Sequence, residues 1–271
     1  MQIDGCTALI TGASAGLGRE FARQLAGRAS AIVLVARRRD RLEELRTELT
    51  ADHPSLGVHV RSADLSDAQQ VTELWKWIDS EGIAVDLLIN NAGLGDRGRF
   101  ATSQLDRTAH MVAVNVAALT ALTRAILPSM LHRQRGAVLN VSSCASFLPM
   151  PAFAVYAATK AYVTSFSEAL RSELQGSGVS VTALCPGPVH TEFDTVALRP
   201  DEPAQKAPEF TYVPAERVVR DALRGIEDDQ PVVIPGIAMK ISLLLVNLTP
   251  MPLLRIALAI SQPSHTPADP R

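Results

Sequence analysis

Tyr156 and Lys160 are four residues apart in the sequence YAATK, inside a stretch of helical period. On a helix such residues share one face, so the phenol and the ammonium are expected to be neighbours. A phenol with a pKa of about 10 is poorly matched to proton transfer near neutral pH. An ammonium ~5 Å away, at an effective dielectric of ~20, favours the phenolate by about 3 kcal/mol. The pair predicts a proton-passing tyrosine, and the alternative is simple packing.

A glycine-rich segment, TGASAGLG at residues 11–18, follows an apolar run and opens a predicted helix. Gly12, Gly16 and Gly18 allow a tight turn and a close approach of the backbone to a ligand. The free N–H groups of a helix N-terminus attract a pyrophosphate. An ordinary glycine-rich turn is the alternative, but its position after the first strand favours dinucleotide binding.

The end of the second predicted strand decides which dinucleotide is expected. NAD-binding proteins place an acidic residue about 20 residues beyond the glycines, whereas this chain has ARRR at residues 36–39. Asp40 and Glu43 match a capping box, so we expect the Asp40 carboxylate to bind backbone N–H groups. The guanidinium groups of Arg37 and Arg38 suit the 2′-phosphate of NADP(H). The sequence therefore predicts NADP(H) in preference to NAD(H).

The elements that must position these residues are predicted from apolar runs that alternate with stretches of helical period. Strands are predicted at TALIT, AIVLVA, GVHVRSA, VDLLIN, GAVLNVSS, VSVTALCPG and PVVIP, and helices from about residues 16, 40, 67 and 214, through 111–130, and around Tyr156. Strands that are apolar on both faces form a parallel sheet covered on both sides. We predict an α/β fold: a single doubly wound Rossmann-type domain with about seven parallel strands, helices on both faces, and a ligand crevice at the carboxyl ends of the strands.

Length and composition narrow the class of protein. The 271 residues suffice for one large domain. A net charge of -2 with both signs interspersed gives no support to nucleic-acid binding. Three cysteines without C-x-x-C spacing, and a start without the regions of a signal peptide, predict a reduced, cytoplasmic protein. The six histidines are dispersed, so no metal site is predicted.

Further motifs stand at strand ends or on the helices that follow. They are NNAG at residues 90–93, Asn115 in the long apolar helix, Ser143 thirteen residues before Tyr156, and PGPVHT at residues 186–191. With TGxxxGxG and Tyr-x-x-x-Lys in this order, the chain resembles the classical short-chain dehydrogenase/reductase family from about residue 6 to about residue 235. It is most similar to the subgroup of ketoacyl and hydroxysteroid reductases.

The resemblance implies a catalytic tetrad of Asn115, Ser143, Tyr156 and Lys160. Ser143 would hydrogen-bond the substrate oxygen, Lys160 would also hold the nicotinamide ribose, and Asn115 would keep a water for proton relay. Because Asn115 stands among apolar residues, where a polar side chain needs a partner, a purely structural hydrogen bond is the alternative.

The resemblance also implies cofactor contacts beyond the glycine turn. Asp64 would contact the adenine together with Leu65, and the alternative for Asp64 is a capping role at the start of the next helix. The full set of predicted cofactor contacts is Gly12, Ser14, Gly16, Leu17, Gly18, Arg37, Arg38, Asp64, Leu65, Asn91, Ala92, Gly93, Tyr156, Lys160, Pro186, Gly187, Val189 and Thr191.

The combined prediction is an NADPH-dependent oxidoreductase that reduces a ketone by hydride transfer, or oxidises the secondary alcohol in reverse. A catalytically silent NADP(H)-binding sensor or scaffold protein of the same fold is the alternative, and the intact tetrad favours the enzyme. Substrate choice is expected to lie with residues 94–100, 144–153 and 188–213. The apolar CASFLPMPAF at 144–153 favours a hydrophobic ketone, whereas Arg97 and Arg99 could meet an acidic tail of an acyl-type substrate.

Two segments shape the domain plan. Residues 1–237 are predicted to form the catalytic domain, including a mobile substrate lid at about 188–213, where a proline-rich stretch has no sustained period. Residues 238–271 form an apolar C-terminal extension and tail of the same domain.

Residues 238–260 are the most apolar stretch, but lysine, asparagine, proline and arginine interrupt it. We predict two short helices broken near Pro250 instead of a membrane span. They could cover the substrate cleft, pair with a second subunit or lie on a membrane surface, and the first two are favoured over the third. The resemblance also implies a homodimer or homotetramer built on the helices at 111–130 and 156–175.

Overall fold

A seven-stranded parallel sheet forms the centre of the molecule in the computed structural model, which describes residues 1–199 and 208–261. The strands are β1 (Thr7–Thr11), β2 (Ala31–Ala36), β3 (Gly57–Ser62), β4 (Leu87–Asn90), β5 (Gly136–Val141), β6 (Val179–Leu184) and β7 (Val232–Val233). Their order is β3-β2-β1-β4-β5-β6-β7: β2 and β3 are added on one side of β1, and β4 to β7 are added on the other, so the order of strands reverses between β1 and β4. The predicted fold class is confirmed, and the ligand crevice of such a sheet lies at this reversal.

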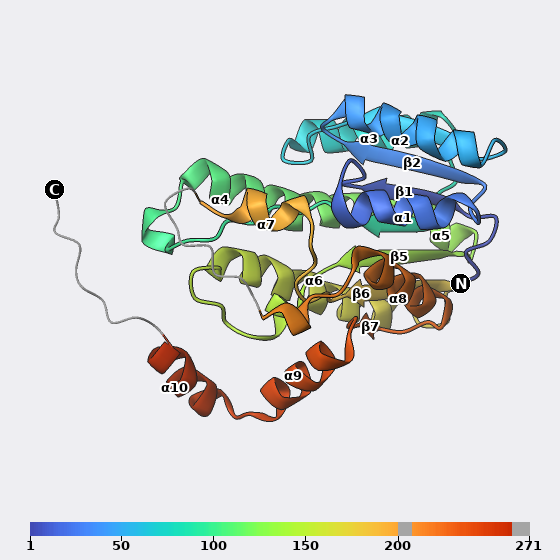
Figure 1. The fold of residues 1–271 in the computed structure, drawn as a ribbon. Helices are drawn as coiled ribbons and strands as arrows, with labels where there is room; N and C mark the ends of the chain where they lie inside the picture. The colour runs from blue at the N-terminus through green and yellow to red at the C-terminus, as the bar shows by residue number, and fades with distance from the viewer. Residues whose placement is uncertain (200–207, 262–271) are drawn as a thin grey trace.

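Helices cover both faces of the sheet (Figure 1). One core joins the sheet to α1 (Gly16–Ala26), α2 (Arg39–Asp52) and α8 (Ala215–Glu227). The other core joins it to α3 (Ala68–Ser80), α5 (Leu119–His132) and α6 (Ala154–Glu173). The central strands are buried along their length, as their unbroken apolar runs predict, while edge strand β3 is half-buried.

The start of α2 differs from its prediction. The helix begins at Arg39, its N-cap is Arg38, and no side chain caps it. Asp40 lies inside the first turn, and Glu43 pairs with Arg39 and Arg46. The predicted capping box is wrong because the helix starts before Asp40, so Asp40 does not occupy the N-cap position from which its carboxylate could cap the helix.

The long apolar helix at 105–132 is one continuous element with a changed winding in its middle. It runs as α4 (Leu105–Val112), a π-helical segment (Ala113–Ala118) and α5. Such segments are frequent at functional sites, and this one contains Asn115. Within the described chain this helix alone is long and apolar enough to cross a membrane, but its buried residues pack into the core against the sheet.

The C-terminal extension forms α9 (Ile237–Leu248) and α10 (Met251–Ser261), so the predicted break near Pro250 is confirmed. Both helices project away from the sheet (Figure 1). Leu243 of α9 is buried. The exposed apolar side chains of the two helices are Ile237, Ile241, Leu244, Leu245, Leu248, Met251, Leu253 and Ile256. The last part of the predicted extension, 262–271, lies outside the described residues.

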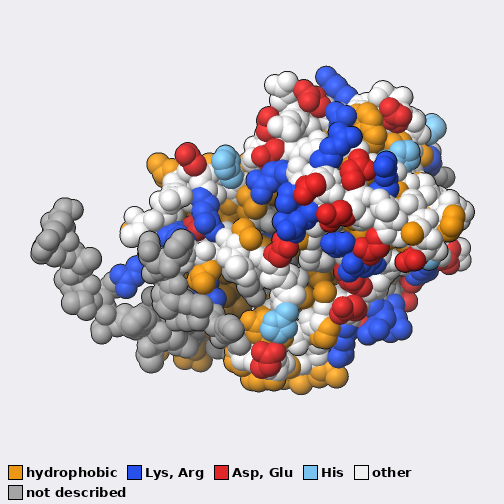
Figure 2. Space-filling model, turned by 45° about the horizontal axis from the view of Figure 1, so that its top comes forward, with side chains coloured by type: hydrophobic (Ala, Val, Ile, Leu, Met, Phe, Trp, Pro, Cys, Tyr) orange, Lys and Arg blue, Asp and Glu red, His pale blue; other side chains and the backbone are white. Residues whose placement is uncertain are grey.

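Charged side chains of both signs alternate over the face shown in Figure 2, and the apolar ones gather toward its lower edge. This distribution agrees with the interspersed charges of the sequence.

Candidate active site

Tyr156 and Lys160 lie on the first turns of α6, and both are buried. The Lys160 Nζ is 5.7 Å from the centre of the Tyr156 ring, which confirms that they share a face. Nζ also donates a hydrogen bond of 2.8 Å to the Val141 carbonyl at the end of β5. Burial lowers the pKa of Lys160 to about 8, so its ammonium is still mostly protonated at neutral pH. A positive charge held there favours the phenolate of Tyr156.

Apolar rings enclose the phenol. Phe153 stacks on Tyr156 with ring centroids 4.3 Å apart. The ring of Phe193, from α7 (Glu192–Ala197), lies with its centroid 5.4 Å from that of Tyr156. Met111 and Ala145 are buried in the same cluster. Because these groups displace water, they strengthen the electrostatic effect of Lys160 on the phenol.

Ser143 lies at the same strand end as the Lys160 contact. It is the N-cap of the short 3-10 helix Cys144–Phe147, and its Oγ accepts a 3.1 Å hydrogen bond from the Ala145 N–H. The neighbouring Ser142 donates 2.8 Å to the Lys160 carbonyl and ties α6 to β5. The fold therefore brings the Ser143 hydroxyl, the Tyr156 phenol and the Lys160 ammonium to one end of β5.

The side chain of Asn115 forms hydrogen bonds with other groups of the protein. Its Oδ1 accepts 2.8 Å from the Leu94 N–H, and its Nδ2 donates 3.0 Å to the Leu94 carbonyl and 3.0 Å to Thr159 Oγ1. Thr159 in turn donates to the Tyr156 carbonyl at 2.7 Å. These contacts support the structural alternative for this side chain, which holds the loop after β4 to the catalytic helix. A water relay at Asn115 stays a prediction. The water would have to bind a remaining lone pair of Oδ1 or of the Asn115 backbone carbonyl.

The glycine turn is shaped for close approach. Gly12 and Gly16 have positive φ values of 68° and 53°, which favour glycine. A Cβ on Gly12 would lie 2.9 Å from the Ala92 Cα, and one on Gly18 would lie 2.3 Å from the Gly12 carbonyl oxygen. Asn91 Nδ2 donates 2.9 Å to the Thr11 carbonyl, so the NNAG loop holds the turn in place. A backbone cradle without side chains before α1 fits a dinucleotide pyrophosphate.

Asp64 is not a helix cap. The N-cap of α3 is Asp67, whose carboxylate accepts from the Gln69 N–H, so the capping alternative is wrong. The Asp64 Oδ1 accepts from the backbone N–H and the hydroxyl of Ser66, and Oδ2 faces Arg37 at 4.0 Å. Leu65 beside it is buried. The adenine contact of this pair stays a prediction.

The predicted phosphate-binding arginines differ in their surroundings. Arg37 is exposed and near Asp64. The Nε and Nη2 atoms of Arg38 lie 3.3 and 3.2 Å from the hydroxyl of Ser14 in the glycine turn, and its Nη1 is 3.1 Å from Glu192 of α7. Arg41 on α2 also pairs with Glu192, at 2.6 Å. Sequence reasoning missed Glu192 and Arg41, although Arg41 is four residues after Arg37 on the first turn of a predicted helix.

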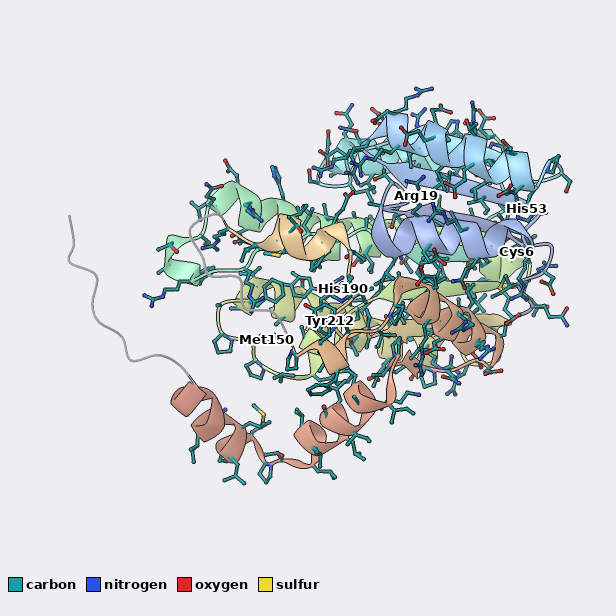
Figure 3. All side chains as sticks on the ribbon, viewed as in Figure 1. Cys6, Arg19, His53, Met150, His190 and Tyr212 are labelled. Carbon is teal, nitrogen blue, oxygen red and sulfur yellow. The ribbon has the colours of Figure 1, made fainter. Side chains whose placement is uncertain are left out.

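The PGPVHT motif leads into the predicted lid. A Cβ on Gly16 would lie 3.4 Å from Thr191, so this motif meets the glycine turn. At the base of the segment, the rings of His190 and Tyr212 stack with centroids 4.0 Å apart (Figure 3). The described parts of 188–213 contain α7 and a 3-10 turn where no periodic structure was predicted. Residues 200–207 of the predicted lid lie outside the described residues.

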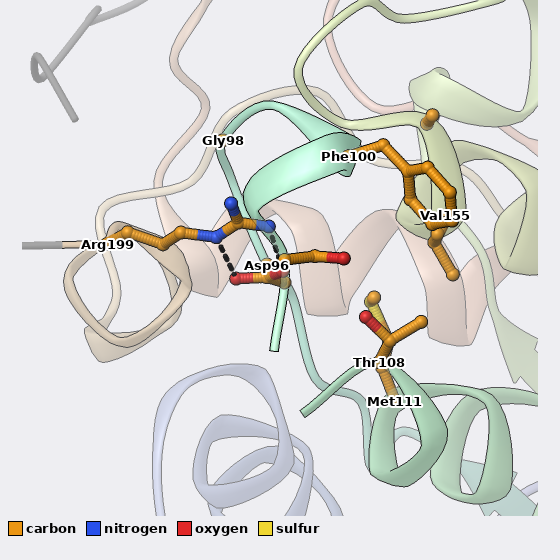
Figure 4. Close-up of a pocket in the computed structure, with 9 residues that line it drawn as sticks. Asp96, Gly98, Phe100, Thr108, Met111, Val155 and Arg199 are labelled. Atoms are coloured by element: carbon orange, nitrogen blue, oxygen red, sulfur yellow. Dashed lines mark hydrogen bonds and ion pairs between the residues drawn. The ribbon is translucent and has the colours of Figure 1, made fainter. Parts of the chain in front are cut away.

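A buried carboxylate fastens α7 to the loop after β4. Asp96 is 6% exposed, and its Oδ1 lies 3.0 Å from Arg107 Nε. The same oxygen lies 2.8 Å from Arg199 Nε (Figure 4). The Arg199 hydrogen bond holds the pKa of Asp96 below its usual value. Arg97 forms a parallel bridge with Leu198. Sequence reasoning missed Asp96 and Arg199, which carry no recognisable motif and are far apart in the chain.

No group of three or more histidine, cysteine, aspartate and glutamate side chains that could hold a metal ion occurs among residues 1–199 and 208–261. The groups gathered at the crevice are the Tyr156 phenol, the Lys160 ammonium, the Ser143 hydroxyl and the glycine cradle described above. Fold and crevice together define a doubly wound α/β protein with a glycine cradle suited to a dinucleotide and a phenol beside a buried ammonium.

Comparisons with known proteins agree with this class. The family model of the short chain dehydrogenase matches residues 6–201, and the chain belongs to this family of oxidoreductases. The NADP-dependent 3-hydroxy acid dehydrogenase of Schizosaccharomyces pombe is 34% identical over 208 residues, 76% of this chain and 79% of the relative. Across four further curated relatives, this chain spans 62% to 73% of the relative's own length.

Solved structures match over nearly the whole chain. A short-chain dehydrogenase from Sphingobium yanoikuyae in complex with NADPH has a TM-score of 0.77 and 29% identity, covering 97% of this chain and 99% of that one. The bulky-bulky ketone specific alcohol dehydrogenase from Comamonas testosteroni has a TM-score of 0.76 and 28% identity, covering 97% of both chains. Structures of this fold hold NAD as well as NADPH. A nicotinamide dinucleotide is therefore the type of cofactor that this family binds.

Proposed function

We propose that the protein reduces a ketone to a secondary alcohol with NADPH, and runs the reverse oxidation with NADP+. The observation that carries this proposal is the Lys160 ammonium, buried 5.7 Å from the Tyr156 ring at the strand end that also bears Ser143. A sensor or scaffold would not need this arrangement. A buried ammonium carries a desolvation cost that packing alone does not explain.

The residues divide the reaction between them. The nicotinamide cofactor, when bound, supplies the hydride that forms the new C–H bond at the carbonyl carbon. The Tyr156 hydroxyl gives its proton to the carbonyl oxygen, and Lys160 stabilises the phenolate that remains. The Ser143 hydroxyl donates a hydrogen bond to the same oxygen and orients it. Asn115 positions the loop after β4 against α6 through Leu94 and Thr159.

The preference for NADP(H) rests on residues of this chain, because relatives of the fold are known with either cofactor. Arg37 and Arg38 follow β2, where an NAD-binding protein would place an acid. The guanidinium of Arg38 extends to Ser14 in the glycine turn. These groups would hold a 2′-phosphate through charge-assisted hydrogen bonds.

A hydrophobic ketone is the substrate class that the enclosure of Tyr156 favours. Phe153 and Phe193 flank the phenol, and Leu94 and Met150 pack against the same cluster. An acidic tail bound near Arg97 or Arg99 is the alternative for an acyl-type substrate, and substrate profiling with neutral and carboxylated ketones of equal size separates the two.

We also propose that segment 188–213 closes over the crevice, that the protein acts in the cytoplasm, and that it is a homodimer or homotetramer. Phe193 of α7 already contacts the Tyr156 ring, which supports a covering role. The cysteines of the described chain are free, in keeping with a reducing compartment. The exposed apolar side chains of α9 and α10 support contact with a covering surface, and a second subunit or the substrate cleft is favoured over a membrane surface.

The test is the loss of NADPH absorbance with a panel of ketones that range from small to bulky aromatic. We expect turnover with the apolar, bulky members. Complete inertness across the panel, by a protein that binds NADPH tightly, would favour the silent sensor or scaffold.

A further inference from the structure

Glu192, the first residue of α7, lies close to the arginines that follow β2. Its carboxylate reaches back to the arginines at the end of β2: Oε1 lies 2.6 Å from Arg41 Nη1, and Oε2 lies 3.1 Å from Arg38 Nη1. The same Arg38 guanidinium contacts Ser14 through its other two nitrogens. The Glu192 carboxylate therefore pairs with arginines at the place where the ribose 2′-phosphate of the cofactor is proposed to bind.

The pairing is easily exchanged. The Glu192 side chain is 51% exposed, and those of Arg38 and Arg41 are 42% and 37% exposed. Ion pairs in such surroundings contribute little because water and salt screen them. A phosphate monoester carries nearly two charges and three acceptor oxygens, so it competes well against one carboxylate for the same guanidinium groups.

The other end of α7 is fastened more firmly. Arg199, just beyond the helix, binds the buried Asp96, and the Arg97 N–H donates 2.8 Å to the Ala197 carbonyl. Phe193 between these two attachments touches the catalytic tyrosine. Release of Glu192 would thus free only the first turn of α7, the part nearest the cofactor arginines.

We propose that Glu192 is an internal anion that occupies Arg38 and Arg41 until the 2′-phosphate of NADP(H) displaces it. The proposal rests on the NADP(H) preference argued above and adds Arg41 to the groups that bind the phosphate. NAD(H) lacks this phosphate and leaves Glu192 in place. The start of α7 therefore responds to the phosphate and not to the rest of the dinucleotide.

The test uses two small probes that differ in the phosphate, adenosine 2′,5′-bisphosphate and adenosine 5′-monophosphate, titrated by calorimetry. We expect Glu192→Gln to tighten the bisphosphate about fivefold, the size of a lost exposed ion-pair competitor, and to leave the monophosphate within about twofold. Asp40→Asn removes a carboxylate next to Arg41 that makes no ion pair with Arg38 or Arg41, and we expect it to change bisphosphate affinity by less than about twofold. Hydrogen exchange at 192–195, the first turn of α7, should rise with the bisphosphate alone.

Two results would overturn the proposal in different ways. If the parent prefers the bisphosphate and Arg38→Ala removes that preference, but Glu192→Gln leaves bisphosphate affinity unchanged or weaker, displacement is wrong while the NADP(H) assignment stands. If the parent binds both probes equally, the NADP(H) assignment fails and the displacement fails with it.

Discussion

Helix α6 and the two C-terminal helices α9 and α10 each break the usual rule that apolar side chains are buried and polar ones exposed, but in opposite ways. Helix α6 buries polar side chains, whereas α9 and α10 expose apolar ones. Each buried group of α6 has a partner within the fold: Lys160 donates to Val141, and Thr159 donates to the Tyr156 carbonyl. On α9, Leu243 is covered, but Leu244 and Leu245 beside it are not.

The difference separates two kinds of function. The fold itself satisfies the polar groups of α6, so the chain can hold them buried without a second surface. The apolar groups of α9 and α10 remain in water in the single chain, so we expect a further surface to cover them.

Tyr156→Phe should lower turnover by about a thousandfold, because it removes the transferred proton and little volume. NADPH affinity, measured by fluorescence titration, should be nearly unchanged. Tyr162→Phe, the same change at an exposed position of α6, serves as the matched control. Turnover within about tenfold of the parent would remove Tyr156 from the proton transfer.

Lys160→Met should abolish turnover and yet raise the free energy of unfolding at neutral pH by about 1 to 3 kcal/mol. Burial lowers the Lys160 pKa from 10.5 to about 8, so the folded state holds the proton less well than the unfolded state. The parent is therefore penalised fully below pH 8, and the penalty disappears as pH rises from about 8 to 10.5.

Urea unfolding at neutral pH and near pH 10 measures this effect. The stability gain of Lys160→Met should be present at the lower pH and small at the higher one. A variant that is less stable than the parent at neutral pH would mean that the hydrogen bond to Val141 outweighs the cost of burying the ammonium.

Changes on α9 test the outward-facing half of the comparison by sedimentation. Replacing Leu245 and Leu248 by glutamate should lower the mass of the assembly without lowering turnover per chain, because both side chains are exposed. Lys240→Glu on the same helix controls for the added charge. Vesicle binding by the parent would favour the membrane surface, and a parent monomer that ignores vesicles would leave only the intramolecular cover.

Arg37→Ala should weaken NADPH relative to NADH by roughly 1.5 kcal/mol, the size of one charge-assisted hydrogen bond. Arg39→Ala is the matched control, because it removes the same charge from a residue paired with Glu43 on α2. Equal losses for both cofactors in the Arg37 variant would show that Arg37 does not read the 2′-phosphate.

The sequence predicted what short-range patterns determine. Unbroken apolar runs placed the strands, and the spacing of Tyr156 and Lys160 placed both on one face of α6. The break near Pro250 followed from a residue that cannot continue a helix. These features depend on residues that are close together in the chain.

What the sequence missed depends on distant partners. Asp96 meets Arg199 and Glu192 meets Arg38 across more than a hundred residues, and no local pattern marks either pair. The π-helical segment at Asn115 likewise coincides with bonds to Leu94 and Thr159 that only the folded chain supplies. The capping box at Asp40 failed because the chain leaving β2 enters its helix earlier than the motif suggests.

The most direct test of the central claim is the fate of the cofactor hydride. NADPH that carries deuterium at the reacting nicotinamide carbon is incubated with a bulky apolar ketone, and the alcohol is examined by mass spectrometry. The account predicts one deuterium on the carbinol carbon with the parent and almost none with Tyr156→Phe. Tight NADPH binding without deuterium transfer to any ketone in the panel would contradict it.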